Sequence, residues 1–195
     1  MADFDGSLSQ IDGSSSARMP VHEIGVRSAG LSRESVQVAR RPRSLEVLAQ
    51  TASALADTVR KRSAAVLRTR PFEGKWTPNE VIGHLVDGEW VGGYRLRLIL
   101  CEDSPAILGM NQDLWVAGQQ HNEREPSELV EMFRTMRQFN LALWKRMSPA
   151  DLTRTGQHNE RGPESLAVML RMLAGHDLSH LDQITRYIQA VRQRD

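Results

Sequence analysis

The amino-acid sequence predicts an all-α protein, an antiparallel four-helix bundle that follows a disordered N-terminal tail. Apolar residues recur at helical spacings of three and four in four long segments after residue 43. Pro, Gly and Asn residues separate these segments, and no segment is a convincing strand. In a chain of 195 residues these observations favour one domain. We therefore assign residues 1–42 to the tail and residues 43–195 to the bundle.

The first 42 residues are rich in Ser, Gly, Asp and Arg and show no apolar period. Such a segment cannot bury enough apolar surface to offset the entropy lost on ordering, so we expect it to be mobile. Met19 is an alternative start of translation.

The first helix is predicted from Ser44 to about Arg68, where Pro71 and Gly74 follow as stop signals. Apolar residues spaced by three, four and seven positions form a stripe along one face of this helix: Leu45, Leu48, Ala52, Leu55, Val59 and Val66.

The second helix begins with a strong capping signal. Thr77 can accept a hydrogen bond from the amide of Glu80, and the Glu80 side chain can return one to Thr77. Pro78 suits the first helical position. The apolar pattern then continues to about Cys101.

The rest of the chain holds two connections and two helices. Residues 102–125 lack a clear period, and a loop this long in a compact domain usually serves function, so we predict a lid or mouth there. A third helix covers about 126–147 and a second connection 148–162. The fourth helix runs from residue 163 or 165 to 191.

Composition excludes several classes of partner. Twenty-five basic and 24 acidic side chains leave a net charge of +1, which gives no general attraction to nucleic acid. The single cysteine, Cys101, cannot form an internal disulfide, which fits a reducing, cytoplasmic location. No apolar run is long enough to span a membrane, and the first residues do not form a signal peptide.

Three histidines form the candidate metal site. His176 and His180 lie one turn apart on the core face of the fourth helix, and His84 lies on the inward face of the second. Three imidazoles suit a divalent transition metal such as Zn, Ni, Fe, Mn or Co, and they leave a coordination position open. The spacing HxxxH also arises by chance, and a lone buried histidine usually forms only a hydrogen bond within the core.

Two segments carry a resemblance to the DinB/YfiT-like superfamily. The first resembles the second-helix signature of that family, and it reads Gly74-Lys75-Trp76-Thr77-Pro78-Asn79-Glu80-Val81-Ile82-Gly83-His84-Leu85-Val86-Asp87-Gly88-Glu89. The second is similar to the fourth-helix motif, and it reads Leu173-Ala174-Gly175-His176-Asp177-Leu178-Ser179-His180-Leu181-Asp182-Gln183-Ile184. The resemblance covers about residues 43–191.

The resemblance implies an antiparallel four-helix bundle, often a homodimer, with a divalent metal bound by His84, His176 and His180. Relatives include bacillithiol and mycothiol S-transferases, a mycothiol-dependent maleylpyruvate isomerase and unassigned hydrolases. We therefore expect a metal-dependent S-transferase or hydrolase with a small-molecule substrate, and bacillithiol or mycothiol is a candidate co-substrate. The alternative is a non-catalytic metal-binding bundle that serves storage, sensing or interaction.

Several further side chains have two interpretations. Glu80 and Asp87 lie one turn either side of His84, where they either accept its second ring proton or are solvated. Arg95 returns to the His84 face and either forms a structural ion pair or binds an anionic substrate. Asp113 and Trp115 either line the mouth of the site or, in the case of Trp115, anchor the loop.

The other histidines and the cysteine are left out of the predicted site. His22, His121 and His158 lie in the tail or in loops, where an isolated histidine is usually solvated. Cys101 is interpreted as a small apolar residue near a helix end, because a thiol from solution would make a protein thiol unnecessary.

Overall fold

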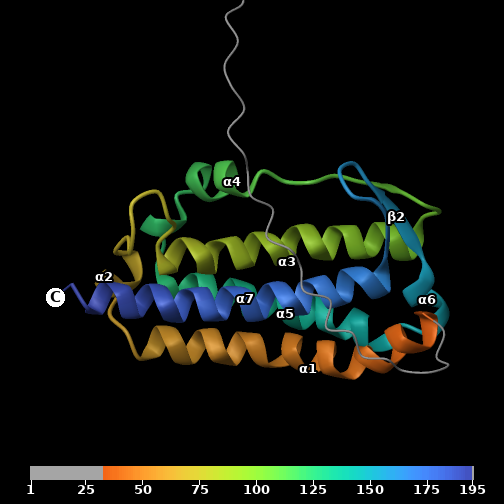
Figure 1. Ribbon diagram of the computed structural model, residues 1–195, viewed down its shortest axis with the longest axis horizontal. Coiled ribbons are helices and arrows are strands. Elements are labelled where there is room, and N and C mark those ends of the chain that lie inside the picture. The colour runs from red at the N-terminus through yellow and green to blue at the C-terminus, as the bar shows by residue number, and fades with distance from the viewer. Residues whose placement is uncertain (1–32, 195) are drawn as a thin grey trace, which may run out of the picture. The chain divides into compact units, whose positions relative to one another are not determined.

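The structure, a computed structural model, describes residues 33–194, with side chains from Arg41 onward. Four long helices form a bundle, as predicted (Figure 1), and they are α1 (Arg33–Arg60), α3 (Pro78–Cys101), α5 (Pro126–Arg146) and α7 (Leu166–Arg192). The expectations for residues 1–32 of the tail, including Met19 and His22, concern residues outside the described part of the chain.

Helix α1 differs from the prediction at both ends. It begins at Arg33, so residues 33–42 belong to a helix, and Pro42 lies inside it. The side chain of Arg41 donates hydrogen bonds to the carbonyls of Trp144 and Lys145 at the C-terminal end of α5. These carbonyls have no partner within their own helix, so a cation there is stabilising.

The predicted continuation of the first helix to Arg68 is wrong. The chain leaves α1 at Arg60 and starts a short helix, α2 (Ala64–Arg68). Ser63 caps α2, because its hydroxyl accepts a hydrogen bond from the amide of Val66. The apolar residues keep their helical spacing across this break, so the sequence pattern did not reveal it.

The predicted start of α3 is confirmed. Thr77 accepts from the Glu80 amide at 3.1 Å, and Glu80 accepts from the Thr77 amide at 2.6 Å. Farther along α3, Gly93 permits a close approach of α5, since a Cβ there would lie 2.5 Å from an amide atom of Asn140. Helix α3 is thereby held in register against its neighbours.

A small sheet covers one end of the bundle, although the sequence predicts no strand. Its order is β1 (Ala106–Ile107), β2 (Thr155–His158) and β3 (Gly162–Ser165), with β1 parallel to β2 and β2 antiparallel to β3. Strands of two to four residues are too short to show alternation in a sequence. The sheet ties the 102–125 connection to the hairpin before α7.

Three short helices complete the connections. Helix α4 (Gln112–Gly118) packs along α3 (Figure 1) and is followed by the 3-10 helix η1 (His121–Glu123). Helix α6 (Pro149–Thr153) has a capping box of its own, formed by Ser148 and Asp151.

A buried polar layer divides the core into two hydrophobic clusters. One cluster gathers around Trp144 and the other around Phe133. Between them, every long helix contributes a buried polar side chain to the layer: Thr51, Glu89, Arg137, Asn140 and Asp177.

Arg137 is at the centre of this layer. Its guanidinium contacts Asp177 at 2.6 Å and Glu89 at 2.9 Å. Burial opposes the charge on Arg137, but the two carboxylates outweigh it and raise the pKa of the guanidinium above its ordinary value. The layer is therefore a buried, compensated ionic network that joins all four long helices.

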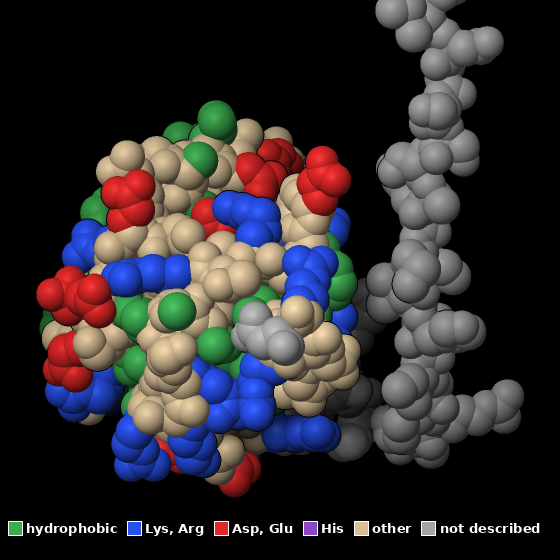
Figure 2. All heavy atoms as spheres, turned by 90° about the vertical axis from the view of Figure 1, so that its left-hand side faces the viewer, with side chains coloured by type: hydrophobic (Ala, Val, Ile, Leu, Met, Phe, Trp, Pro, Cys, Tyr) green, Lys and Arg blue, Asp and Glu red, His purple; other side chains and the backbone are tan. Residues whose placement is uncertain are grey.

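The end of the bundle that carries α2 and the C-terminus of α7 presents many basic side chains (Figure 2). A hollow of about 540 Å³ there lies between α1 and α7, and its lining includes Lys61, Arg62 and Arg192. None of the three predicted ligands lines this hollow, so it is separate from the candidate metal site.

Candidate metal centre

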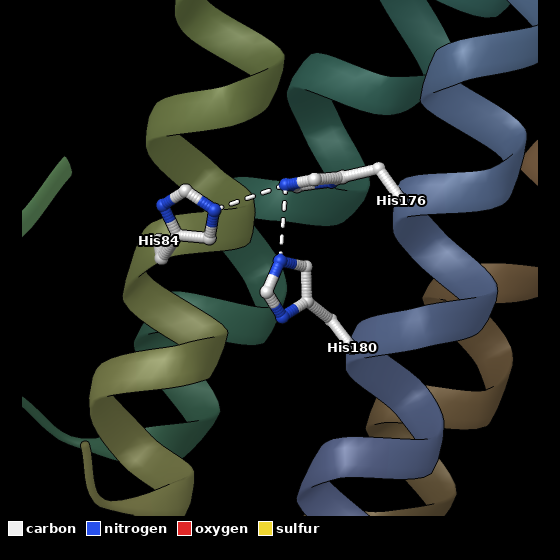
Figure 3. Close-up of side chains that lie close together, drawn as sticks. All are labelled: His84, His176 and His180. Atoms are coloured by element: carbon white, nitrogen blue, oxygen red, sulfur yellow. Dashed lines mark hydrogen bonds between the residues drawn. The ribbon is translucent and has the colours of Figure 1, made fainter. Parts of the chain in front are cut away.

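The structure brings the three predicted histidines together in the interior of the bundle. His84 projects from the second turn of α3 toward His176 and His180 on α7 (Figure 3). Nε2 of His176 lies 3.0 Å from Nε2 of His84 and 3.1 Å from Nε2 of His180. Each ring offers one ligand atom, and these atoms lie within 4.8 Å of one another.

This geometry suits a shared metal better than it suits hydrogen bonds alone. A neutral imidazole nitrogen either donates one hydrogen bond or accepts through one lone pair, whereas Nε2 of His176 faces two other ring nitrogens. Nitrogen ligands of a tetrahedral zinc ion stand about 3.3 Å apart, given a Zn–N bond of about 2.05 Å. The two separations from Nε2 of His176, 3.0 and 3.1 Å, are close to that value.

The environment keeps the three rings neutral. Burial, followed by the charges of His176 and His180, lowers the pKa of His84 to about 3. Burial and His180 lower the pKa of His176 to about 4, and burial also lowers the pKa of His180. At neutral pH the imidazoles therefore have lone pairs available, which metal binding requires.

Gln183 orients His180, a role that we did not predict. Nδ1 of His180 lies 2.6 Å from Oε1 of Gln183, and the Gln183 amide donates to the hydroxyl of Tyr187 at 3.0 Å. Because an amide oxygen only accepts, Nδ1 of His180 carries the proton and Nε2 carries the lone pair. The spacing of three residues after His180 was the available sequence signal.

Glu80 and Asp87, the two candidate acceptors for the second ring proton of His84, are not its partners. Asp87 accepts from His121 Nε2 and from the Gln119 amide, both at 2.9 Å. Glu80 is engaged in the α3 cap and in an ion pair with Arg70. Nδ1 of His84 is buried without a partner among the described residues, and Trp76 packs over the ring with centroids 5.0 Å apart.

The expectation that His121 and His158 are solvated is wrong. Both side chains are buried, at 3% exposure. His121 packs on Gly83 and pairs with Asp87, which ties the end of the long loop to α3. Nδ1 of His158 accepts from the amide of Glu160 and stabilises the turn between β2 and β3. Tertiary contacts, which sequence spacing does not report, bury both rings.

A pocket of about 170 Å³ adjoins the triad. Gly88 and His176 form one part of its lining, while Arg95, Arg161 and Glu164 form another. This pocket gives a small molecule access to the side of the triad formed by His176.

The other candidate residues lie away from this pocket. Trp115 lines a different hollow with Asp87 and Trp90, and Asp113 and Cys101 are exposed.

The sequence profile of the DinB superfamily matches residues 47–184, a range that contains all three histidines.

The chain belongs to the DinB superfamily.

Two relatives of this DinB-superfamily chain carry related names. It is 30% identical over 132 residues to "Putative metal-dependent hydrolase OB0782" of Oceanobacillus iheyensis, which covers 67% of this chain and 76% of that protein. It is 27% identical over 95 residues to "Putative metal-dependent hydrolase YfiT" of Bacillus subtilis. That second match spans 49% of this chain and about half, 53%, of the relative.

The fold of this DinB-superfamily chain has a solved counterpart. The structure of YfiT from Bacillus subtilis, described as an unusual four-helix bundle, superposes with a TM-score of 0.72 at 21% identity. The match covers 84% of this chain and 91% of that structure. Within the described part of the chain, none of the helices is long and apolar enough to cross a membrane.

Proposed function

We propose that this protein is a metal-dependent hydrolase of small molecules, with a divalent transition metal held by His84, His176 and His180. The convergence of three neutral imidazole nitrogens beside a pocket carries this proposal. Two relatives named as metal-dependent hydrolases support the same reaction class.

The proposed ion would activate water and polarise a substrate carbonyl as a Lewis acid. In ester hydrolysis, the water oxygen bonds to the carbonyl carbon, the bond from that carbon to the alkoxy oxygen breaks, and the alcohol leaves with a proton. Since all three ligands are neutral, the site would retain the full charge of the ion, which favours an anionic nucleophile. Gln183 would keep His180 in the required tautomer.

A second candidate reaction is transfer of a low-molecular-weight thiol such as bacillithiol or mycothiol. Asp87 and Asp177 are carboxylates whose charges act on the triad, and both have other partners. Asp87 accepts from Gln119 and His121, and Asp177 accepts from Thr51 and Arg137. A thiol, which ionises more readily than water, has less need of a protein base. In this reaction the thiolate sulfur bonds to the electrophilic carbon and displaces its leaving group.

Metal content tests the proposed site. Purified protein should carry close to one transition-metal ion per chain, and a protein with both His176→Ala and His180→Ala should carry none. Elemental analysis of both proteins gives the answer. Absence of metal from the unmodified protein, after incubation with zinc, nickel, iron, manganese or cobalt, would refute the metal assignment.

Turnover distinguishes the enzymatic proposals from a non-catalytic bundle. Metal-loaded protein is assayed with a carboxylate ester alone and with an electrophile plus bacillithiol or mycothiol, beside His84→Ala protein. Ester cleavage supports the hydrolase, and thiol-dependent conjugation supports the transferase. Cobalt-substituted protein shows by its absorption spectrum whether the thiol reaches the metal. A bound ion without either reaction would favour storage, sensing or interaction.

We also propose that the protein forms a homodimer in the cytoplasm. Large apolar side chains are exposed on α3, α4 and α5, among them Trp90 and Leu114, and these two line one hollow with Met132. A second copy would cover this surface. Sedimentation of the purified protein tests the assembly, and a monomer at micromolar concentration would contradict it.

A further inference from the structure

Arg95 is a guanidinium without a carboxylate partner in the wall of the pocket beside the triad. No described carboxylate forms an ion pair with it; instead it donates a hydrogen bond to the carbonyl of Leu108. Its Nε is buried without a partner among the described residues. The structural ion pair considered from the sequence is therefore absent from this part of the chain.

The surroundings of Arg95 favour an added negative charge. Arg161 lines the same pocket and is paired with Glu164 at 2.8 Å. Burial, followed by the charge of Arg161, lowers the pKa of Arg95 from its ordinary value, while Glu164 and Glu160 act in the opposite direction. Glu160 is exposed and lies over Gly109. An arginine side chain stays charged at neutral pH, so the lowered pKa of Arg95 indicates that the protein compensates incompletely for its desolvation.

We propose that this pocket takes a small substrate that carries a carboxylate, and that Arg95 binds this carboxylate while the bond to be cleaved lies beside the three histidines. The inference rests on the proposed function, because it assigns the substrate class of the same site. A guanidinium presents parallel N–H donors that match the two oxygens of a carboxylate. The carbonyl of Leu108 fixes the orientation of this guanidinium.

The position and the size of the pocket limit the substrate. Gly88, which adjoins His176, and Arg95 are seven residues apart on α3, and this separation corresponds to about 10 Å along the helix axis. The pocket volume of about 170 Å³ is below the roughly 300 Å³ at which pockets for drug-sized ligands begin. A short-chain acid with its reactive group a few bonds from the carboxylate fits both limits.

Arg95 also borders a second, more aromatic hollow of about 280 Å³, which is lined by Trp90, Tyr94 and Trp115. A ligand anchored on Arg95 can therefore place an apolar substituent away from the histidines. Because Arg95 lines both hollows, it can bind the carboxylate of a ligand that occupies the first hollow alone or both hollows.

Binding can be tested without turnover by titrating zinc-loaded protein with glutarate and, separately, with the neutral diamide glutaramide. The readout is the NMR signal of the Arg95 Nε–H group, assigned by its loss in Arg95→Lys protein. We expect glutarate to shift this signal in a saturable way and glutaramide to leave it unchanged. Arg95→Met should weaken glutarate binding by about tenfold or more.

The matched control is Arg134→Met, which removes an equal charge from the exposed face of α5. This variant should bind glutarate as the unmodified protein does. Failure of glutarate to bind, an unmoved Arg95 signal, or equal binding by Arg95→Met protein would each overturn the inference.

Hydrolysis of monomethyl glutarate and dimethyl glutarate separates this inference from the proposed function. The half-ester keeps one carboxylate, so it should have a KM about tenfold lower, and Arg95→Met should remove that difference. Cleavage of both esters with equal KM would refute the carboxylate site while preserving the hydrolase. Binding of glutarate through Arg95, with neither ester cleaved, would preserve the anion site and contradict the hydrolase.

Discussion

At the scale of single residues, the candidate site depends on which ring nitrogen is protonated. A histidine binds a metal through the nitrogen that lacks a proton, so a hydrogen bond to the other nitrogen decides whether the lone pair faces the ion. His180 has such a partner in Gln183, and Tyr187 in turn holds the Gln183 amide. Gln183 and Tyr187 therefore support the triad from farther along α7 without being metal ligands themselves.

We expect Gln183→Leu to weaken metal binding by about tenfold to a hundredfold, because Nδ1 of His180 would lose its acceptor. Gln183→Glu retains an oxygen acceptor and should restore most of the affinity. Zinc affinity is measured by competition with a chromophoric chelator, with Gln189→Leu on the exposed face of α7 as the control. Equal affinities of the Leu variant and the unmodified protein would contradict this role for Gln183.

At the scale of elements, the long connection is held to α3 by a close contact between a glycine and a histidine. A Cβ on Gly83 would lie 2.2 Å from the His121 ring, and the same ring pairs with Asp87 one helical turn later. Asn79 adds a bond from its amide to the carbonyl of His121 at 2.8 Å. These contacts place η1 against the N-terminal half of α3, close to the triad.

Gly83→Ala should therefore destabilise the protein, although alanine normally favours a helix. The added Cβ would lie within 2.6 Å of three His121 atoms, so the clash should cost about 2 to 3 kcal/mol, which exceeds the roughly 1 kcal/mol gained in helix propensity. Gly175→Ala on α7 is the matched control, because nothing outside its own stretch of helix lies within 4 Å of the added Cβ, and it should be neutral or stabilising. Urea denaturation measures both changes. A stabilised Gly83→Ala protein would contradict the prediction, because it would show that the segment around His121 moves aside at little cost.

Long elements were predictable from the sequence, whereas contacts between distant segments were not. Capping residues and apolar stripes predicted α3, α5 and α7 to within a few residues, because these signals are local and repeat over many turns. The turn between α1 and α2 does not interrupt the apolar period, and the strands are too short to show one. The burial of His121 depends on Gly83, which precedes it by 38 positions.

The meeting of the three histidines was also predictable, because it follows from regular helix geometry. His176 and His180 share a face through helical geometry, and an antiparallel bundle places the inward face of α3 opposite them. The partner of Asp87 and the missing ion pair of Arg95 depend on the path of the loop and the hairpin. Sequence spacing also does not distinguish buried Arg137 from exposed Arg134.

At the scale of the whole molecule, a buried polar layer crosses the bundle next to the candidate metal site. Asp177 directly follows His176, and Glu89 directly follows Gly88 at the pocket wall. Arg137 joins the two carboxylates, so α3, α5 and α7 are connected at this level. Apolar packing alone allows helices to slide, whereas such a network has one satisfied register.

Removal of the central cation should have a large effect. We expect Arg137→Met to lower the free energy of unfolding by about 3 to 5 kcal/mol, because Glu89 and Asp177 would be left as buried, uncompensated charges. Arg134→Met, whose ion pair with Glu131 is exposed, should leave the free energy of unfolding nearly unchanged. Chemical denaturation compares the variants, and similar losses from both would contradict a structural role for the layer.

The proposed metal would join α3 to α7, so its removal should change stability without unfolding the bundle. Two apolar clusters and the polar layer already connect all four long helices without it. A ligand at a hundredfold excess over its Kd adds about 2.7 kcal/mol, and in a chain of this size that corresponds to a rise of about 5 to 10 °C in Tm. Metal-free protein should therefore keep its helical circular dichroism and melt at a correspondingly lower temperature. His84→Ala should melt at nearly the same temperature with and without added metal, since one of the three ligands is lost. If metal removal abolished helicity, the ion would be required for folding; if it left Tm unchanged, the histidines would not bind it in the folded protein.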